Sequence, residues 1–155
     1  MLKQCREDKI VDIRIQESES SLVNALSERL KKDFNLKLVV VVPSKNDPGD
    51  TLVSAGAAAS KLLESELKNS IKIGISWGTS LYQMVEALPP QSMLDMEIIQ
   101  LVGSLGMANP SFDGFELARK LSRKLNGSYH LIQAPIVVKN IKLKKLLLHE
   151  HPIAE

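Results

Sequence analysis

Small and hydroxyl-bearing residues cluster where an apolar stretch ends, in the segment Ser76-Trp77-Gly78-Thr79-Ser80. Gly78 permits a tight turn or the close approach of a ligand, while Thr79 and Ser80 offer hydroxyl groups for hydrogen bonds. If a helix starts here, its free backbone N–H groups and the positive end of its dipole suit a phosphate or another anion. The segment is therefore a candidate binding site, although a plain turn followed by Ser80 as helix N-cap explains the same residues. Trp77 either packs in the core or forms a wall of that site.

A second turn, which contains two glycines, runs from Gly103 to Pro110 after another apolar stretch. Ligands of open α/β folds bind where strands end and helices begin, so this turn is a candidate for the other side of the same site. Gly103, Ser104 and Leu105 open the turn, and the amide of Asn109 can hydrogen-bond a sugar hydroxyl. Long loops at strand ends often carry function, but a flexible connection is an equally good interpretation.

The pattern Gly-x-Ser-x-Gly, which marks the nucleophile of many serine hydrolases, also occurs here with Ser76 at its centre. Such an enzyme needs an acid and then a histidine later in the chain, and the candidates are Asp95, Asp113, His130, His149 and His151. However, no histidine–glycine run precedes Ser76 to supply an oxyanion hole, and so short a pattern arises by chance. A serine hydrolase is therefore kept only as an alternative.

The sequence lacks the usual patterns for cofactors and metals. There is no Gly-x-Gly-x-x-Gly fingerprint for a dinucleotide, and no lysine follows Gly78 as a P-loop requires. Cys5 is the only cysteine, and His149 and His151 have no evident third ligand, so we expect no metal centre and no cofactor.

The overall composition is that of an ordinary soluble domain. The chain has 155 residues, of which 44% are hydrophobic and 25% are charged, and its formal net charge is +2 at pH 7. This length suffices for one domain with its own core, and the small net charge does not require nucleic acid or an acidic membrane as partner. No apolar run approaches the ~20 residues of a membrane span, and the N-terminus has no signal-peptide pattern, so we expect a cytoplasmic protein.

Hydrophobic periodicity alternates between the strand and the helix pattern along the chain. Apolar or period-two runs rich in β-branched residues predict strands at residues 10–15, 36–42, 71–75, 97–102 and 128–132. Apolar residues at helical spacing predict helices at residues 22–34, 55–67, 81–88, 113–125 and 139–151. Turn residues predict loops at 44–50 and 103–111. The apolar residues 135–138 are interpreted as a connector or as an extension of the preceding strand.

Two capping pairs are predicted at helix starts, Ser80 with Gln83 and Asp113 with Glu116. The small residues of the helix at 55–67 are expected to pack closely on a sheet. Alternating strands and helices with apolar strands predict an α/β fold, a Rossmann-like three-layer domain whose parallel sheet is covered on both faces.

These motifs together resemble one known family, the SorC-type (sugar-binding DeoR-like) bacterial transcription regulators. Residues 77–81 are similar to the family's tryptophan–glycine–polar–threonine signature, in which Ser80 keeps the hydroxyl. Residues 99–104 resemble its next strand and paired-glycine turn, and Ala134-Pro135 resembles its alanine–proline pair. Residues 117–127 match the intervening helix. The resemblance therefore covers nearly the whole chain.

The resemblance implies an effector-binding domain with a fold similar to sugar-phosphate isomerases and glucosamine-phosphate deaminases. Such a domain binds a sugar or phosphosugar without catalysis, forms homo-oligomers, and contacts operator DNA only through a separate N-terminal helix-turn-helix. The ligand-binding residues that we expect are Trp77, Gly78, Thr79, Ser80, Gly103, Ser104, Leu105 and Asn109. Residues 1–9 would be a remnant of the DNA-binding helix and linker, and residues 10–155 a partial effector-binding domain.

The sequence departs from the family pattern in three places. The helix-turn-helix is almost entirely missing, and the chain stops at Glu155 where family members continue, which leaves the expected fold incomplete at the C-terminus. Val102 stands where some members have an arginine suited to phosphate, and Ser104 replaces the second glycine. Two further alternatives remain: a phosphosugar isomerase or deaminase with Asp113 as general base, and a truncated regulator with only an oligomerisation role.

Overall fold

The computed structural model describes residues 17–106 and 110–150. Tertiary contacts divide the chain into unit 1, residues 1–44, and unit 2, residues 45–155, and each unit is described by itself. Unit 2 contains both candidate turns. Several predictions of the sequence lie outside the described residues, namely the strand at 10–15, the linker at 1–9, Asn109 and the end of the last helix at His151.

Unit 1 contains the helix α2 (Glu17–Asp33), which confirms the first predicted helix. The predicted strand at residues 36–42 is wrong, because these residues form no strand in the structure. Its apolar side chains are largely open to solvent, and Leu36, Leu38 and Val40 are 47–54% exposed. A run of β-branched residues favours an extended backbone, but a strand also needs a partner for its hydrogen bonds. Unit 1 supplies no such partner in its described part.

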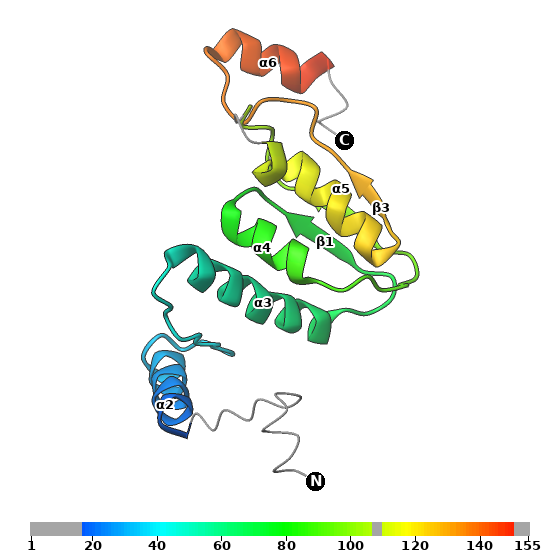
Figure 1. The fold of residues 1–155 in the computed structure, drawn as a ribbon. Coiled ribbons are helices and arrows are strands. Elements are labelled where there is room, and N and C mark those ends of the chain that lie inside the picture. Colours follow the sequence, from blue (N-terminus) through cyan, green and yellow to red (C-terminus); the bar gives the residue numbers. More distant parts are fainter. Residues whose placement is uncertain (1–16, 107–109, 151–155) are drawn as a thin grey trace. The chain divides into compact units, whose positions relative to one another are not determined.

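Unit 2 is an α/β unit around a parallel sheet (Figure 1). Its elements in order are α3 (Pro48–Glu66), β1 (Lys72–Ile75), α4 (Thr79–Ala87), β2 (Glu97–Gln100), the 3-10 turn η1 (Pro110–Phe112), α5 (Gly114–Leu125), β3 (Ser128–His130) and α6 (Ile141–Glu150). The sheet has the order β1-β2-β3, and the register aligns Ile73 with Ile98 and Ile98 with Tyr129. The predicted fold class and the last three predicted strands are confirmed, although the strands are shorter than expected.

The helix α3 begins seven residues before its predicted start, within the segment that was predicted to be a loop. Asp47 is the N-cap, and its Oδ1 accepts hydrogen bonds from the backbone N of Gly49 at 2.6 Å and of Asp50 at 3.3 Å. Pro48 occupies the first helical position, where its fixed φ is favourable. The same Asp-Pro-Gly residues that favour a turn also favour a helix start, which explains the error.

The small residues of α3 pack against α4 and not against the sheet, contrary to the prediction. Gly56 and Ser60 are the buried residues of this helix. A Cβ atom at Gly56 would lie only 2.4 Å from Cβ of Gln83, so the two helices approach most closely where one of them has no side chain. Gln83 therefore serves helix packing.

The predicted capping pair of Ser80 and Gln83 is also wrong. The helix α4 starts two residues earlier than predicted, with Gly78 as N-cap at φ 135° and ψ 158°, and no side chain caps it. Ser80 is already inside the helix as its second residue. A backbone with this positive φ suits glycine and disfavours a residue with a Cβ, so the glycine fixes the helix start.

The helix α5 covers the sheet and supplies four residues of the hydrophobic core (Figure 1). Its four predicted core residues, Leu117, Ala118, Leu121 and Leu125, are all fully buried. They join residues in or directly beside β1, α4 and β2 in one cluster, namely Ile75, Val85, Leu88, Met96 and Ile98. In the described part of unit 2 the opposite face of the sheet carries no helix, and Leu101 beyond β2 is 58% exposed there. The described residues thus form two of the three predicted layers.

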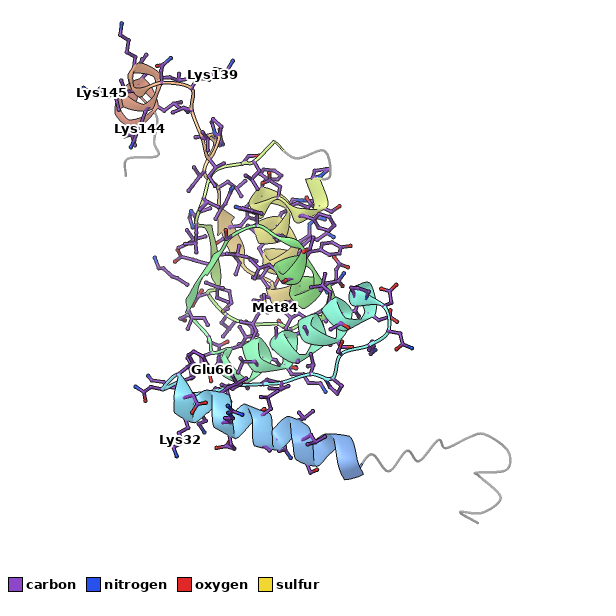
Figure 2. All side chains as sticks on the ribbon, turned by 90° about the vertical axis from the view of Figure 1, so that its left-hand side faces the viewer. Lys32, Glu66, Met84, Lys139, Lys144 and Lys145 are labelled. Atoms are coloured by element: carbon purple, nitrogen blue, oxygen red, sulfur yellow. The ribbon has the colours of Figure 1, made fainter. Side chains whose placement is uncertain are left out.

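The last predicted helix is confirmed as α6, where the Asn140 side chain accepts a hydrogen bond from the backbone N of Leu143 at 2.9 Å. The lysines on and before this helix are solvent-exposed, and Figure 2 shows Lys139, Lys144 and Lys145 extending around it. Within the ranges 17–106 and 110–150, no helix is both long and apolar enough to cross a membrane.

Candidate ligand-binding site

A cleft of about 500 Å³ opens where β2 and β3 end, beside the first turn of α5. The carboxyl end of a parallel sheet is the usual place for ligands in α/β folds, and this volume falls within the range of small-molecule sites. Its described lining comprises Gln100, Ser104, Gly106, Pro110, Asp113, Phe115, Glu116, Ile132, Gln133, Ala134 and Pro135. The cleft therefore belongs to the second of the two turns that the sequence indicated.

Asp113 organises the loop on one side of the cleft. Its carboxylate is 6% exposed and accepts three hydrogen bonds: from Ser104 Oγ at 2.7 Å, from the backbone N of Leu105 at 3.2 Å and from the backbone N of Phe115 at 3.1 Å. Burial by itself would raise the pKa of Asp113, but these hydrogen bonds outweigh that effect and the pKa is lowered. Asp113 is thus an ionised N-cap of α5 that also fixes the turn at Ser104.

Ser104 joins this carboxylate to the chain that follows β3. Its backbone N donates to the carbonyl of Ala134 at 2.9 Å, and its carbonyl accepts from the backbone N of Ile136 at 2.9 Å. The two chains approach so closely that a Cβ atom at Gly103 would lie 2.3 Å from the Ala134 carbonyl oxygen. Gly103 therefore permits this pairing, which extends the sheet past the end of β2 and β3.

Gln100 is a buried polar residue of the cleft that sequence reasoning missed. Its side chain is 2% exposed; Nε2 donates to the carbonyl of Val102 at 2.7 Å, and Oε1 accepts from the backbone N of Ile132 at 3.2 Å. The amide thereby ties together the two chain segments that leave β2 and β3. The available signal was one amide within the otherwise apolar run at 98–102.

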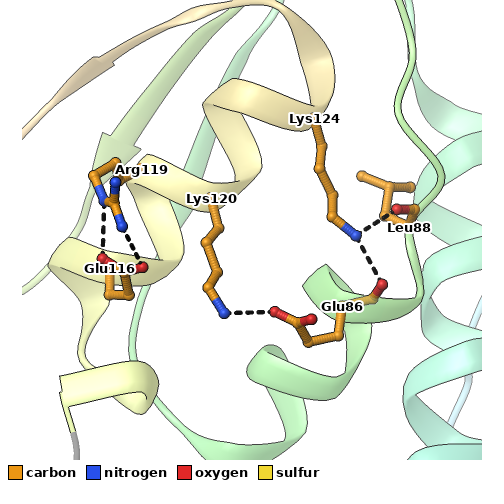
Figure 3. Close-up of polar contacts among 6 residues, drawn as sticks. All are labelled: Glu86, Leu88, Glu116, Arg119, Lys120 and Lys124. Atoms are coloured by element: carbon orange, nitrogen blue, oxygen red, sulfur yellow. Dashed lines mark hydrogen bonds and ion pairs between the residues drawn. The ribbon is translucent and has the colours of Figure 1, made fainter.

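Glu116 is not the capping partner of Asp113, contrary to the prediction. The backbone N of Asp113 donates to the carbonyl of Pro110 at 3.0 Å instead. Glu116 accepts two hydrogen bonds from Arg119, at 2.6 Å and 2.9 Å (Figure 3). The hydrogen bond from Arg119 is the main cause that lowers the pKa of Glu116, and burial opposes it. Glu116 is therefore a second ionised carboxylate at the cleft.

The first predicted turn lies at the same end of the sheet but does not line the described cleft. The backbone N of Gly78 donates to the carbonyl of Phe112 at 3.0 Å, which places this turn beside η1. Thr79 and Ser80 are solvent-exposed at the start of α4, and Trp77 is 40% exposed. Trp77 is thus not a core residue.

Of the site residues predicted from the sequence, Ser104 lines the cleft. Leu105 contributes its backbone N–H to Asp113, and Gly103 supports the pairing with Ala134. The turn at residues 77–80 lies beside η1 and outside the cleft lining. Asn109 lies outside the described residues.

Two lysines of α5 hold α4 and α5 together behind the cleft (Figure 3). Lys120 Nζ pairs with Glu86 Oε1 at 2.6 Å, while Lys124 Nζ donates to the backbone carbonyls of Glu86 and Leu88, both at 2.7 Å. The carbonyls at the C-terminal end of a helix lack intrahelical partners, so Lys124 satisfies groups that would otherwise need water. This arrangement fixes the helix whose N-terminal turn carries Asp113 and Glu116.

Comparison with known proteins gives consistent matches. The family model described as "Putative sugar-binding domain" matches residues 18–155. The transcriptional regulator YjhU of Escherichia coli (strain K12) is 26% identical over 148 residues, which are 92% of this chain and 44% of that protein. The deoxyribonucleoside regulator of Bacillus subtilis (strain 168) is 24% identical over 149 residues, which are 95% of this chain and 47% of that protein.

A solved structure extends these similarities to three dimensions. The full-length sorbitol operon regulator SorC from Klebsiella pneumoniae matches with a TM-score of 0.83 and 26% identity, over 96% of this chain and 49% of that one. The chain therefore spans about half the length of the relatives that it matches.

Proposed function

Because the chain belongs to the family of sugar-binding domains found in SorC- and DeoR-type transcription regulators, we propose that it senses a sugar or phosphosugar effector for such a regulator. The observation that carries this proposal is the cleft at the carboxyl end of β2 and β3. It combines apolar walls from Phe115, Ile132 and Pro135 with polar groups from Ser104 and Asp113. Sugar ligands need both, because their rings pack on apolar surface and their hydroxyls need hydrogen bonds.

The ligand contacts that we propose come from both turns. Ser104 would contact the ligand in the cleft, Gly103 and Leu105 hold the turn on either side of it, and Asn109 is proposed as a ligand residue from the sequence alone. The turn at residues 77–80 lies beside η1 and provides hydroxyl and backbone N–H groups for a ligand that extends beyond the cleft. Occupancy of the cleft changes the loops that close it, and the regulator responds because the ligand binds two conformations with different affinity.

The activity is binding and not catalysis. A phosphosugar isomerase of this fold would use Asp113 as general base, and an efficient base has a pKa near the working pH. Three hydrogen bonds instead lower the pKa of Asp113 and fix its carboxylate to the surrounding backbone and to Ser104. The serine hydrolase alternative lacks support as well, because His130 pairs at 3.5 Å with Glu97 at the start of β2, whereas Ser76 follows the end of the neighbouring strand β1.

The remaining partners follow from the regulator context. Operator DNA would be bound by a helix-turn-helix of the complete regulator, and subunits would associate as homo-oligomers. Regulation of transcription in a bacterium places the protein in the cytoplasm. DNA binding, oligomerisation and location are proposed for the whole regulator, of whose length this chain spans about half.

The test is a thermal-shift screen of sugars and sugar phosphates against the full chain. We expect at least one compound to raise the melting temperature, and the shift to shrink or vanish in Ser104→Ala, which removes a hydroxyl from the cleft. The matched control is Ser65→Ala on α3, which also removes a hydroxyl that bonds a nearby carbonyl, far from the lining of the cleft. A screen without any stabilising sugar or sugar phosphate would contradict the proposed function.

A further inference from the structure

We propose that the cleft beside Asp113 binds an uncharged polyhydroxyl compound, a free sugar or sugar alcohol, in preference to the phosphate ester of that compound. This inference rests on the proposed function, because it names the ligand class of the same site. It is carried by the charges that line the cleft and by the hydrogen bonds that these groups already make.

Both ionisable side chains of the described lining are acidic, namely Asp113 and Glu116. Folding lowers the pKa of each, so both are negatively charged at neutral pH. Among the lining residues that the structure describes there is no lysine, arginine or histidine. The sequence adds none between Gly106 and Pro110, where residues 107–109 are Met, Ala and Asn. The net charge of the whole chain is +2, so the negative charge is local to the cleft.

The cation that pairs with Glu116 is already engaged. Arg119 donates from Nε and from Nη2 to the two carboxylate oxygens of Glu116 and is not part of the cleft lining (Figure 3). Recognition of a phosphate group usually depends on such an arginine fork or on a lysine. Here the fork is directed at a carboxylate of the same helix.

The ionised groups of the lining only accept hydrogen bonds, whereas the amides of Gln100 and Gln133 can also donate them. A carboxylate has about four acceptor positions. Asp113 accepts three hydrogen bonds and Glu116 accepts two, which leaves acceptor positions on both. Ser104 Oγ donates its proton to Asp113 and accepts from the backbone N of Gly106 at 3.2 Å, so towards a ligand it offers one remaining acceptor position. The hydroxyls of a sugar can donate to these groups, whereas an ionised phosphate offers acceptors and negative charge.

A competing site for a phosphate exists at the start of α4. The hydroxyls of Thr79 and Ser80 are exposed there, beside free helical N–H groups. These residues do not line the cleft, so a ligand held by Asp113 and Glu116 gains nothing from them unless its phosphate reaches across η1. A phosphate ester that reached Thr79 and Ser80 would bind more tightly than the free compound, which is the opposite of the result that we expect.

The experiment is isothermal titration calorimetry of the full chain with matched pairs of compounds. The probes are sorbitol and sorbitol 6-phosphate, ribose and ribose 5-phosphate, and glucose and glucose 6-phosphate. For any pair that binds, we expect the free compound to bind at least about tenfold more tightly. The ratio should fall when the salt concentration rises from about 50 to about 500 mM, because salt screens the repulsion between carboxylate and phosphate.

Two variants test whether the cleft carboxylates cause this preference. Glu116→Gln removes one charge from the cleft and releases Arg119, so the ratio of affinities should fall several-fold. Glu86→Gln is the matched control, because Glu86 is also a carboxylate in a 2.6 Å ion pair with a side chain of α5 but lies outside the cleft lining. In that control the ratio should stay unchanged.

The outcomes separate the ligand class from the proposed function. Tighter binding of the phosphate esters, or an equal effect of Glu116→Gln and Glu86→Gln, overturns the preference for uncharged compounds while the sensing function stands. A failure of every probe to bind, together with a negative thermal-shift screen, overturns the sensing function and the ligand class with it.

Discussion

The two carboxylates of the cleft hold different partners, and this difference separates their roles. Asp113 binds the backbone of Leu105 in the loop after β2, the backbone of Phe115 in the first turn of α5 and the hydroxyl of Ser104, so it sets the shape of the cleft. Glu116 binds only Arg119 on its own helix, so it contributes charge without anchoring a loop. Substitution of the first should therefore alter stability, and substitution of the second should mainly alter ligand preference.

The role of Asp113 predicts a specific pH dependence of stability. Because folding lowers its pKa below the ordinary value of 3.8, the stabilisation is complete above that value and is lost as the pH falls through the lower folded pKa. Asp113→Asn should reduce the free energy of unfolding at pH 7 by about 1–3 kcal/mol and should flatten its decline below the ordinary pKa of 3.8. Urea unfolding followed by circular dichroism over a pH series measures both effects.

The control for this experiment is Glu66→Gln, which removes an exposed carboxylate near the end of α3 (Figure 2). This variant should keep the wild-type stability at pH 7 within the error of the measurement. Equal stabilities of Asp113→Asn and the wild type at pH 7 would contradict the anchoring role of Asp113.

At the scale of elements, the position of α5 decides whether the cleft exists. The helix begins at the cleft with Asp113 as its N-cap, and its apolar face lies on the sheet. Its two lysines connect it to α4, one through a carboxylate and the other through the last carbonyls of that helix. An ion pair near the surface contributes little to the free energy of unfolding. An ammonium group that donates to the last carbonyls of a helix contributes more, because these carbonyls have no partner within the helix.

This comparison predicts unequal effects of the two lysines. Lys124→Met should lower the free energy of unfolding by about 1–2 kcal/mol, because the carbonyls of Glu86 and Leu88 lose their charged donor. Lys120→Met breaks the ion pair with Glu86 and the contact of the ammonium group with the Tyr82 ring, 4.8 Å from its centroid, and should cost about 1 kcal/mol or less because both lie near the surface. Chemical unfolding of both variants measures the two losses in the free energy of unfolding. A larger loss for Lys120→Met would show that the contacts of Lys120 contribute more than the hydrogen bonds of Lys124.

At the scale of the whole molecule, stability is concentrated in unit 2. The cluster around α5 consists of fully or almost fully buried side chains. In unit 1, Leu22 of α2 is 71% exposed and Leu26 is 46% exposed, and Phe34 just after the helix is 68% exposed. A helix that buries so little of its apolar face gains little from tertiary packing.

Amide hydrogen exchange should therefore divide the chain into two classes. We expect the amides of α5 to exchange with a protection close to that of global unfolding, and those of α2 to exchange orders of magnitude faster, because local opening of α2 breaks few buried contacts. Mass spectrometry of peptic fragments resolves the two segments. Similar protection in both would show that α2 is held by contacts comparable to those of α5.

The sequence alone determined features whose causes are local. The apolar face of α5 follows from helical periodicity, and its N-cap follows from an aspartate at the helix start. The same holds for the class of the fold, because apolar runs alternate with amphipathic segments. The positions of the two turns at strand ends could be predicted for the same reason.

Tertiary structure decided what depends on residues far apart in the chain. The run at 36–42 has the composition of a strand but no partner within unit 1, and Gln83 faces α3 because Gly56 lies opposite it. The cleft itself arises where Gln100 bonds a backbone group 32 residues away and Ser104 bonds Asp113 nine residues away. Composition shows which groups can donate or accept hydrogen bonds, but only the folded chain determines which donor meets which acceptor, and hence which charges remain to face a ligand.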